Sequence, residues 1–471
     1  MTTPPLDPAD WEGLRSDLHR LLDRCVDQMR DAEDHPWQAP PADLVDRYAI
    51  GTGGDVVTRV MDQVLPYHGG NMHPKFWGWV QGSGLPSDFV AGIAAAAMNT
   101  NGGGRNHGIN EMERAVIDWT RRKMGFGAGA SGVLVAGTSQ ATVISLQVAR
   151  VRACPNVRAE GSNVGLTVYA ADGVHNATRK AVELLGLGHD QLRLVPTQNG
   201  TMDLDALQQV IATDRAQGLS PLAIVGTAGS VDLGAYDNLN RLADLAEAEG
   251  IWLHVDGAFG AWTRLADATW RGLTDGIERA DSIALDFHKW MYVGYDCGLA
   301  LIADETSHRA AFAARPAYLK GAAEGLAGGD PWFCDYGIDL SRGNRALKVW
   351  CALEMFGEEA FATAITRNCA QAAFMADQVQ SHGMSLSAPV VSNICVFTAA
   401  PDLPAARQST LNAKIATHLQ LHNATVFSTT DVDGVTCLRA AITNHRTRDH
   451  HIAEAIADVA KTAQLLKGSL G

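Results

Sequence analysis

Short apolar runs alternate with amphipathic stretches through the middle of the chain, from about residue 110 to residue 303. Seven such runs are predicted to be strands: Gly132–Val135, Leu166–Ala170, Leu192–Val195, Leu222–Val225, Ile251–Val255, Ser282–Leu285 and Leu299–Ile302. Helical spacing of apolar residues lies between them, at Glu111–Met124, Ala141–Ala153 and Leu239–Glu249. Strands that are apolar throughout and separated by helices are typical of a parallel sheet covered on both faces. We therefore predict an α/β fold with a mostly parallel sheet.

The first part of the chain has a different pattern. Apolar residues recur at helical spacing from Trp11 to Arg30, and a Pro-rich stretch at His35–Pro41 interrupts them. Residues 1–72 are predicted to form a helical segment with little core of its own, which packs at an interface with a second copy of the chain. The apolar stretch Phe89–Met98 is shorter than the roughly 20 residues of a membrane-spanning helix, so it is interpreted as a buried helix segment.

The last part of the chain mixes helical and strand patterns. Helices are predicted at Arg345–Phe356, Glu359–Ser381 and His451–Leu466, and strands at Ile394–Thr398 and Val435–Ala441. This mixture predicts a smaller α+β domain over residues 346–471, which leaves residues 73–345 as the large domain.

Composition and charge narrow the possible partners. The chain has 471 residues and a net charge of −14, which a phosphate backbone would repel, so we expect no nucleic-acid partner. The opening residues lack the basic start and apolar stretch of a signal peptide, and no membrane segment is expected. The eight cysteines are widely spaced, which indicates free thiols in a reducing cytoplasm.

Two motifs resemble functional sites but do not have the required context. Gly127–Gly132 fits the spacing GxGxxG, but it follows a helix and precedes a strand, the reverse of a dinucleotide-binding loop. His450 and His451 begin a helix, and we expect no Cys or carboxylate ligand beside them, so we interpret them as solvated and expect no metal site.

The informative polar residues follow the ends of predicted strands. Asp256 ends the strand Ile251–Val255 and is followed by two small residues. Lys289, between His288 and Trp290, follows the strand Ser282–Leu285. A lysine buried at such a point would have a lowered pKa, and its free amine could form a Schiff base with an aldehyde. Taken singly, Lys289 could equally be a surface lysine and Asp256 a turn carboxylate.

Together, these residues fit the requirements of pyridoxal phosphate (PLP). That cofactor needs a lysine for the Schiff base and a carboxylate facing its pyridine nitrogen. It also needs a phosphate cradle, which the strand–Gly137–Thr138–Ser139–helix junction could supply through backbone amides and hydroxyls. Such a junction is common by itself and gains weight only beside Asp256 and Lys289.

These residues resemble the motifs of the group II PLP-dependent decarboxylases, the family of aromatic-L-amino-acid, glutamate and histidine decarboxylases. The resemblance covers most of the chain and rests on Gly137–Thr142, Asp256 and His288–Trp290, with His73–Trp77, Gly226–Ser230, Asp237–Asn238, Tyr295–Gly298 and Arg315–Leu319. It implies the aspartate aminotransferase-like fold type I, PLP as cofactor, and a homodimer with active sites at the subunit interface. It also implies decarboxylation of an L-amino acid to its amine.

The resemblance gives each matching residue a role. Lys289 would form the Schiff base, Asp256 would face the pyridine nitrogen, and Ala258 and His175 would contact the two ring faces. The residues around the phosphate and Lys289 would be Thr138, Ser139, His288 and Ser230. Tyr318 would protonate the substrate carbon from a mobile loop. The substrate side chain would meet Trp77, Trp79 and Gln81.

Two departures and two alternatives affect this interpretation. Asp286 stands where aromatic members carry asparagine, and Val231 stands where they carry threonine. The segment rich in tryptophan favours an aromatic substrate, while aliphatic and acidic substrates stay open. The resemblance extends to a subset of the family, the oxidative aldehyde synthases, which carry phenylalanine where this chain has Tyr318. Tyr318 therefore argues against that activity. A non-catalytic subunit would not need Lys289, Asp256 and His175 together.

Overall fold

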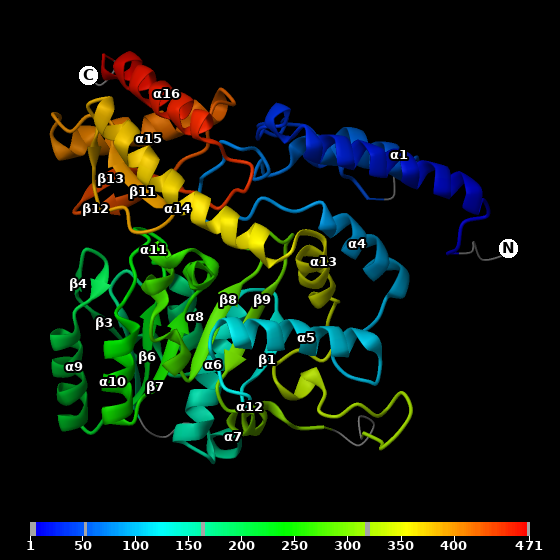
Figure 1. Cartoon of the computed structure of the whole chain (residues 1–471), viewed down its shortest axis with the longest axis vertical. Helices are drawn as coiled ribbons and strands as arrows, with labels where there is room; N and C mark the ends of the chain where they lie inside the picture. Colours follow the sequence, from blue (N-terminus) through cyan, green and yellow to red (C-terminus); the bar gives the residue numbers. More distant parts are fainter. Residues whose placement is uncertain (1–5, 51–53, 162–164, 316–320, 469–471) are drawn as a thin grey trace.

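The structure is a computed structural model that describes residues 6–50, 54–161, 165–315 and 321–468. Figure 1 shows a large domain around one sheet, a smaller domain beside it, and an N-terminal helix that extends away from both. Within the described ranges, none of the helices combines the length and the apolar character needed to cross a membrane.

The large domain is built on a seven-stranded sheet in the order β1-β9-β8-β7-β6-β2-β3. Its strands are β1 (Ser131–Val135), β2 (Leu166–Ala171), β3 (Leu192–Val195), β6 (Ser220–Thr227), β7 (Trp252–Asp256), β8 (Ser282–Asp286) and β9 (Gly298–Ile302). Only β9 runs against its neighbours in this sheet, so the prediction of a mostly parallel sheet is confirmed. A two-stranded ribbon, β4 (Thr197–Gln198) with β5 (Thr201–Met202), accompanies it.

Helices surround this sheet and bury its apolar strands (Figure 1). They are α5 (Gly108–Lys123), α6 (Thr138–Ala153), α7 (Val157–Glu160), α8 (Asn176–Leu184), α9 (Leu204–Ala216), α10 (Leu239–Glu249), α11 (Ala268–Arg271), α12 (Glu305–Phe312) and α13 (Ala346–Phe356). Strands β1, β7, β8 and β9 are buried along their whole length. A strand covered on both faces exposes polar residues only beyond its ends, which is where the site residues lie.

The smaller domain has a four-stranded antiparallel sheet in the order β10-β11-β13-β12. Its elements are β10 (Ser385–Leu386), β11 (Ile394–Thr398), β12 (Ser428–Val432), β13 (Val435–Ala441), α14 (Glu358–Ser381), α15 (Ala405–Leu421) and α16 (Asp449–Lys467). The first half of α14 packs in the core of the large domain, through Phe361 and Ile365, and the second half in that of the smaller one, through Met375 and Val379. The predicted domain boundaries stay a prediction.

The N-terminal part contains α1 (Trp11–Arg30), α2 (Leu44–Arg47), α3 (Val56–Arg59) and α4 (Ser87–Met98). Helix α4 corrects one prediction: the stretch Phe89–Met98 is helical but not buried in this chain. Val90 and Ile93 are 51% and 60% exposed, and Ser87 and Ala91 are the buried residues of the helix. The apolar pattern of the sequence identified the helix, but it could not show whether the rest of the chain covers the apolar face.

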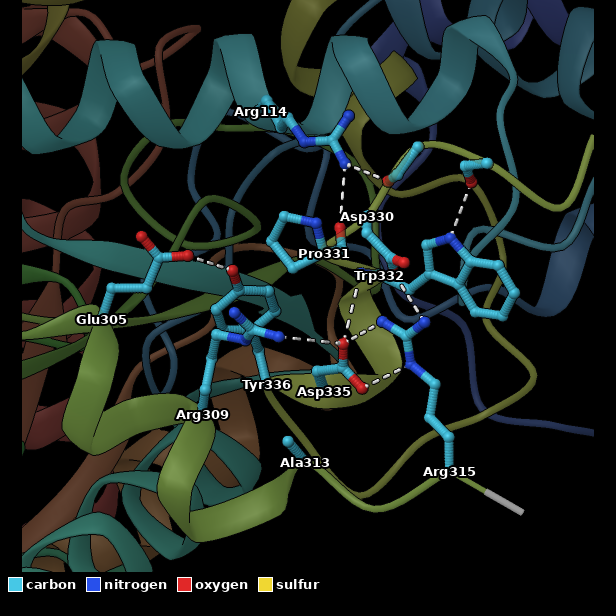
Figure 2. A network of polar contacts seen from close by, with 12 residues as sticks. Arg114, Glu305, Arg309, Ala313, Arg315, Asp330, Pro331, Trp332, Asp335 and Tyr336 are labelled. Atoms are coloured by element: carbon cyan, nitrogen blue, oxygen red, sulfur yellow. Dashed lines mark hydrogen bonds and ion pairs between the residues drawn. The ribbon is translucent and has the colours of Figure 1, made fainter. Parts of the chain in front are cut away.

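A polar network joins the two sides of the segment that contains residues 316–320 (Figure 2). Arg315 forms ion pairs with Asp330 at 2.5 Å and with Asp335, and its guanidinium lies 4.3 Å from the centre of the Trp332 ring. Arg114 donates to the carbonyl oxygens of Gly329 and Pro331. The chain on both sides of this segment is therefore fixed to the large domain. Tyr318 lies outside the described residues.

Candidate active site

A cavity of about 680 Å³ lies beyond the carboxyl ends of the parallel strands. Residues that follow β1, β2, β6, β7 and β8 line it, together with Trp79–Gln81 and three residues of the smaller domain, Ser428, Thr429 and Arg439. Parallel strands end at one edge of the sheet, so residues distant in sequence converge there. Of the predicted residues, the structure brings ten to this cavity: Thr138, Ser139, His175, Ser230, Asp256, Ala258, His288, Lys289, Trp79 and Gln81.

Lys289 and Asp286 form an ion pair at the floor of the cavity. Lys289 Nζ lies 2.8 Å from Asp286 Oδ2, and the Asp286 side chain is 2% exposed. The other oxygen, Asp286 Oδ1, accepts a hydrogen bond of 2.7 Å from the backbone N–H of Thr138, the first residue of α6. The sequence did not predict this pairing, which joins the lysine to the amino end of a helix through one carboxylate.

Asp256 lies at the end of β7 and is buried, with 7% of its surface exposed. Its Oδ1 accepts a hydrogen bond of 3.1 Å from the backbone N–H of Ala258. Burial raises the pKa of Asp256, while the charges of Lys289 and His175 act in the opposite direction. A carboxylate removed from water in this way is stabilised in its charged form by a cation placed against it.

His288 is buried beside Lys289. Its Nδ1 lies 3.0 Å from the carbonyl oxygen and 3.1 Å from the amide nitrogen of Cys297, and its ring packs against Tyr295 with centroids 4.4 Å apart. Burial lowers the pKa of His288, although Asp286 opposes that shift. The ring is therefore a neutral imidazole at neutral pH, fixed in position between the loop and the cavity.

His175 begins α8 and faces the cavity from β2. Its Nδ1 accepts a hydrogen bond of 3.2 Å from the backbone N–H of Ala177, so the side chain caps the helix. An acceptor at Nδ1 places the proton of the neutral ring on Nε2. Ser230 Oγ in turn accepts from the backbone N–H of Ala235 at 3.0 Å, which closes the turn after β6.

Trp77 does not line the cavity, which corrects its predicted role in the substrate pocket. It is fully buried in the core of the smaller domain, where its ring meets Phe427 edge-on with centroids 5.6 Å apart and its Nε1 donates to Thr447 Oγ1. Trp79, in contrast, is 55% exposed at the cavity. Its backbone is left-handed, with φ of 55°, so the two indoles of this short segment do not share one side.

Arg439 is a cavity residue that sequence reasoning missed. It lies on β13, 3% exposed, and donates to the carbonyl oxygens of Asp232 at 3.1 Å and Trp79 at 3.0 Å. Its Nη2 is buried without a hydrogen-bond partner among the described residues. Burial lowers the pKa of Arg439 to about 10, so it stays charged at neutral pH. An arginine within a predicted strand was the available signal, but only tertiary packing brings β13 to the cavity.

The prediction for the histidine pair at α16 is wrong for His451, which is buried and close to a carboxylate. Its Nδ1 accepts from the backbone N–H of Arg448 at 3.0 Å, and its Nε2 lies 3.3 Å from Glu33 Oε1. Glu33, His450 and His451 are close enough together to surround a cation. Because Nδ1 already accepts, the neutral ring carries its proton on Nε2 and offers no lone pair there for a metal.

The cavity residues fit PLP on three counts. Thr138 Oγ1 is buried beside the amino end of α6 and has no partner among the described residues, so it can donate to a phosphate. Lys289 Nζ reaches the cavity and can bond an aldehyde. The buried carboxylate of Asp256 lies in the same lining and can face a pyridinium nitrogen.

The chain was then compared with known proteins. It matches the pyridoxal-dependent decarboxylase conserved domain over residues 53–397. It is 27% identical to the aromatic-L-amino-acid decarboxylase of Bacillus atrophaeus, over 95% of this chain and 96% of that one. It is 26% identical to the phenylacetaldehyde synthase of Arabidopsis thaliana, over 98% of both chains.

The fold comparison agrees. The crystal structure of Oryza sativa TDC with PLP and tryptamine matches with a TM-score of 0.90 and 24% identity, over 98% of this chain and 100% of that one. This match confirms the predicted fold type I, with its large sheet and smaller C-terminal domain. The family match confirms PLP as the cofactor. The chain belongs to the family of pyridoxal-dependent decarboxylases.

Proposed function

We propose that this enzyme decarboxylates an aromatic L-amino acid to the corresponding amine and carbon dioxide. The observation that carries the proposal is the single cavity that joins Lys289, Asp256 and the amino end of α6. Membership of the decarboxylase family supports the reaction. Trp79 at the cavity and the aromatic-L-amino-acid decarboxylase of Bacillus atrophaeus support the choice of an aromatic substrate.

The residues of the cavity floor have separate tasks in this proposal. PLP, when bound, supplies a sink for the electron pair that remains when carbon dioxide leaves. Lys289 holds the cofactor covalently through its amine. Asp256 keeps the pyridine nitrogen protonated, because its buried carboxylate is stabilised by a cation. His175 and Ala258 contact the two ring faces. Thr138, Ser139, Ser230 and His288 surround the phosphate and Lys289.

Arg439 and the residues opposite it orient the substrate. The unpartnered Nη2 of Arg439 can donate to the carboxylate of an amino acid, and hydrogen bonds between charged groups are the stronger ones. The substrate side chain then lies toward Trp79, Gln81 and Val231, which line the same cavity. Val231 offers no hydroxyl there, so an aromatic ring would meet an apolar wall.

The similarity to a phenylacetaldehyde synthase makes aldehyde formation the second candidate. The two outcomes differ in whether a proton or oxygen reaches the substrate carbon first. We assign that proton to Tyr318, whose phenol can act as a general acid. Tyr318→Phe keeps the ring and removes the acid, so we expect amine formation to fall sharply in air. Aldehyde, ammonia and hydrogen peroxide should rise, because oxygen takes up the two electrons that the proton would otherwise have trapped. Unchanged amine release without aldehyde would contradict this assignment.

We also propose a homodimer in the cytoplasm. The exposed apolar residues of α1 and α4 support a partner surface on these two helices, since a large exposed apolar area is unusual in a monomer. Each of the eight cysteines lies in the described part of the chain as a free thiol, which supports a reducing compartment.

A substrate screen tests the proposed function directly. The full chain with PLP is incubated with the twenty protein amino acids and common non-protein ones, and amine, aldehyde and carbon dioxide are measured. Release of amine from Trp, Tyr, Phe or their hydroxylated relatives is the expected result. Release from acidic or aliphatic amino acids alone would overturn the aromatic assignment, and dominant aldehyde release would favour the second candidate.

A further inference from the structure

Asp286 occupies an unusual position for an acid, because it faces the place where an anion should bind. Its Oδ1 accepts from the backbone N–H of Thr138, a donor that the amino end of α6 would otherwise offer to a phosphate. Thr138 Oγ1, buried beside it, has no partner among the described residues. The Asp286 carboxylate therefore lies at the same helix terminus as the Thr138 hydroxyl, which a phosphate would need as a donor.

The charges around Asp286 balance only while Lys289 is an ammonium ion beside it. Lys289 Nζ lies 2.8 Å and His288 Nε2 3.7 Å from Asp286 Oδ2. The imidazole of His288 is neutral because burial lowers its pKa. From the neighbouring strand β7, Asp256 adds a second acidic group, whose pKa burial raises. Among the described lining residues Arg439 is the other strong cation, and it is held by backbone carbonyls near Trp79.

Tyr295 and Cys297 complete the titratable groups near Asp286. Burial raises the pKa of Tyr295 to about 12 and also raises the pKa of Cys297, and the charge of Asp286 adds to both shifts, so both stay neutral. Neither can neutralise an added anion. A phosphate monoester is mostly a dianion above its second pKa of about 6. A dianion and a carboxylate on one helix terminus repel each other, and one added proton relieves that repulsion.

We propose that Asp286 and the phosphate of the cofactor share one proton, taken from solvent, so that PLP binding is coupled to protonation. As a carboxylic acid, Asp286 donates a hydrogen bond to phosphate instead of repelling it. The inference rests on the proposed placement of PLP in this cavity. According to this inference, PLP binds to the form of the site that holds one added proton between Asp286 and the phosphate. PLP affinity should therefore fall as pH rises.

Isothermal titration of PLP into the full-length protein measures this proton. Titrations at pH 8 in buffers of different ionisation enthalpy give the number of protons taken up. We expect wild type to take up about one proton more than Asp286→Asn, whose amide donates at every pH. Between pH 7 and 8.5 the Kd of wild type should rise about tenfold per pH unit relative to that of the variant. Absorbance spectra of both proteins check that Lys289 bonds PLP in the same protonation state.

Asp339→Asn is the matched control, because Asp339 accepts from Gln140 on the first turn of α6 but does not line the cavity. It should keep the proton uptake of wild type. Equal proton uptake by wild type and Asp286→Asn would overturn the inference and leave the proposed function standing. Failure of wild type to bind PLP at all would overturn both.

Discussion

The cavity floor and helix α4 differ in whether their side chains find partners within one chain. At the floor, Asp286 pairs with Lys289 and with the backbone N–H of Thr138, and Asp256 is buried. On α4, Val90 and Ile93 present apolar side chains to solvent. Asp286 is therefore paired within the subunit, whereas the apolar face of α4 is not covered, and this difference supports the proposed dimer contact at α4.

The two regions are connected. Asp88 of α4 accepts hydrogen bonds from the backbone N–H of Leu85 at 3.0 Å and of Gly294 at 2.9 Å. Gly294 precedes Tyr295, which lines the cavity, and Lys348 of α13 donates to the Tyr295 carbonyl at 2.5 Å. A partner that covers α4 would therefore fix the loop that follows Lys289. The comparison predicts that damage to either region lowers activity, but by different routes.

Lys289→Ala should have the largest effect and should act within one subunit. We expect turnover to fall by at least about ten-thousandfold, since covalent attachment of the cofactor is lost. The fold and the oligomeric state should not change, because this side chain is partly exposed and its contacts are polar. Amine release measures the first effect. Mass spectrometry after borohydride reduction should find PLP on the Lys289 peptide of wild type, and label on another lysine would contradict the assignment.

Ile93→Asp should act through the partner. A charge placed in an apolar interface costs about 4 kcal/mol, which corresponds to roughly a thousandfold weaker association. The monomer should stay folded, because Ile93 is 60% exposed in the single chain. Light scattering at micromolar concentration measures the change, and activity should fall with the dimer.

Leu184→Asp provides the control for that variant. Leu184, at the end of α8, is 75% exposed and lies on neither α1 nor α4, so its substitution should leave the dimer intact. Two outcomes would contradict the proposed role of α4. Either the dimer survives Ile93→Asp, or both variants dissociate it to the same extent.

Asp256→Asn should keep the cofactor but lose about a hundredfold in kcat. Loss of a buried charge pair costs about 3 kcal/mol, and each 1.4 kcal/mol is about tenfold in rate. The neutral amide preserves the shape and the hydrogen bond from Ala258. The ratio of bound PLP to protein and kcat are the two measurements. Activity within about threefold of wild type would show that Asp256 does not stabilise the pyridinium.

The sequence predicted the floor of the cavity better than its walls. Asp256 and Lys289 follow strands whose apolar runs are easily recognised, and the carboxyl ends of parallel strands meet at one edge. Arg439 comes from a separate sheet, and strand periodicity carries no information about how two domains pack. Glu33 and His451 are more than 400 positions apart, so their contact could not be predicted either.

Trp77 and Trp79 show a more local limit. The family resemblance implied one role for both residues, and in an extended segment residues two positions apart would also point to the same face. The backbone of Trp77 instead hydrogen-bonds to Val426 of the smaller domain, and Trp79 turns into the left-handed region. The alternation is broken at a single residue, and no pattern in the sequence marks the break.

Substituting these two tryptophans separately should give the smallest effects on catalysis and the sharpest test of the domain contact. Trp77→Ala removes a fully buried ring and its hydrogen bond to Thr447, so unfolding free energy should fall by about 3–5 kcal/mol. The folded fraction should retain its kcat and KM, because Trp77 does not line the cavity. Urea unfolding and steady-state kinetics on the same preparation measure both.

Trp79→Ala should have the reverse effects. Its side chain is 55% exposed, so the stability change should stay within about 1 kcal/mol. Loss of the indole from the cavity should raise KM for aromatic substrates about tenfold, the equivalent of about 1.4 kcal/mol of uniform binding, with kcat nearly unchanged. The main-chain carbonyl of Trp79 still accepts from Arg439, which keeps in place the arginine proposed to bind the substrate carboxylate. A KM rise for Trp77→Ala but not for Trp79→Ala would reverse the assignment of the two rings.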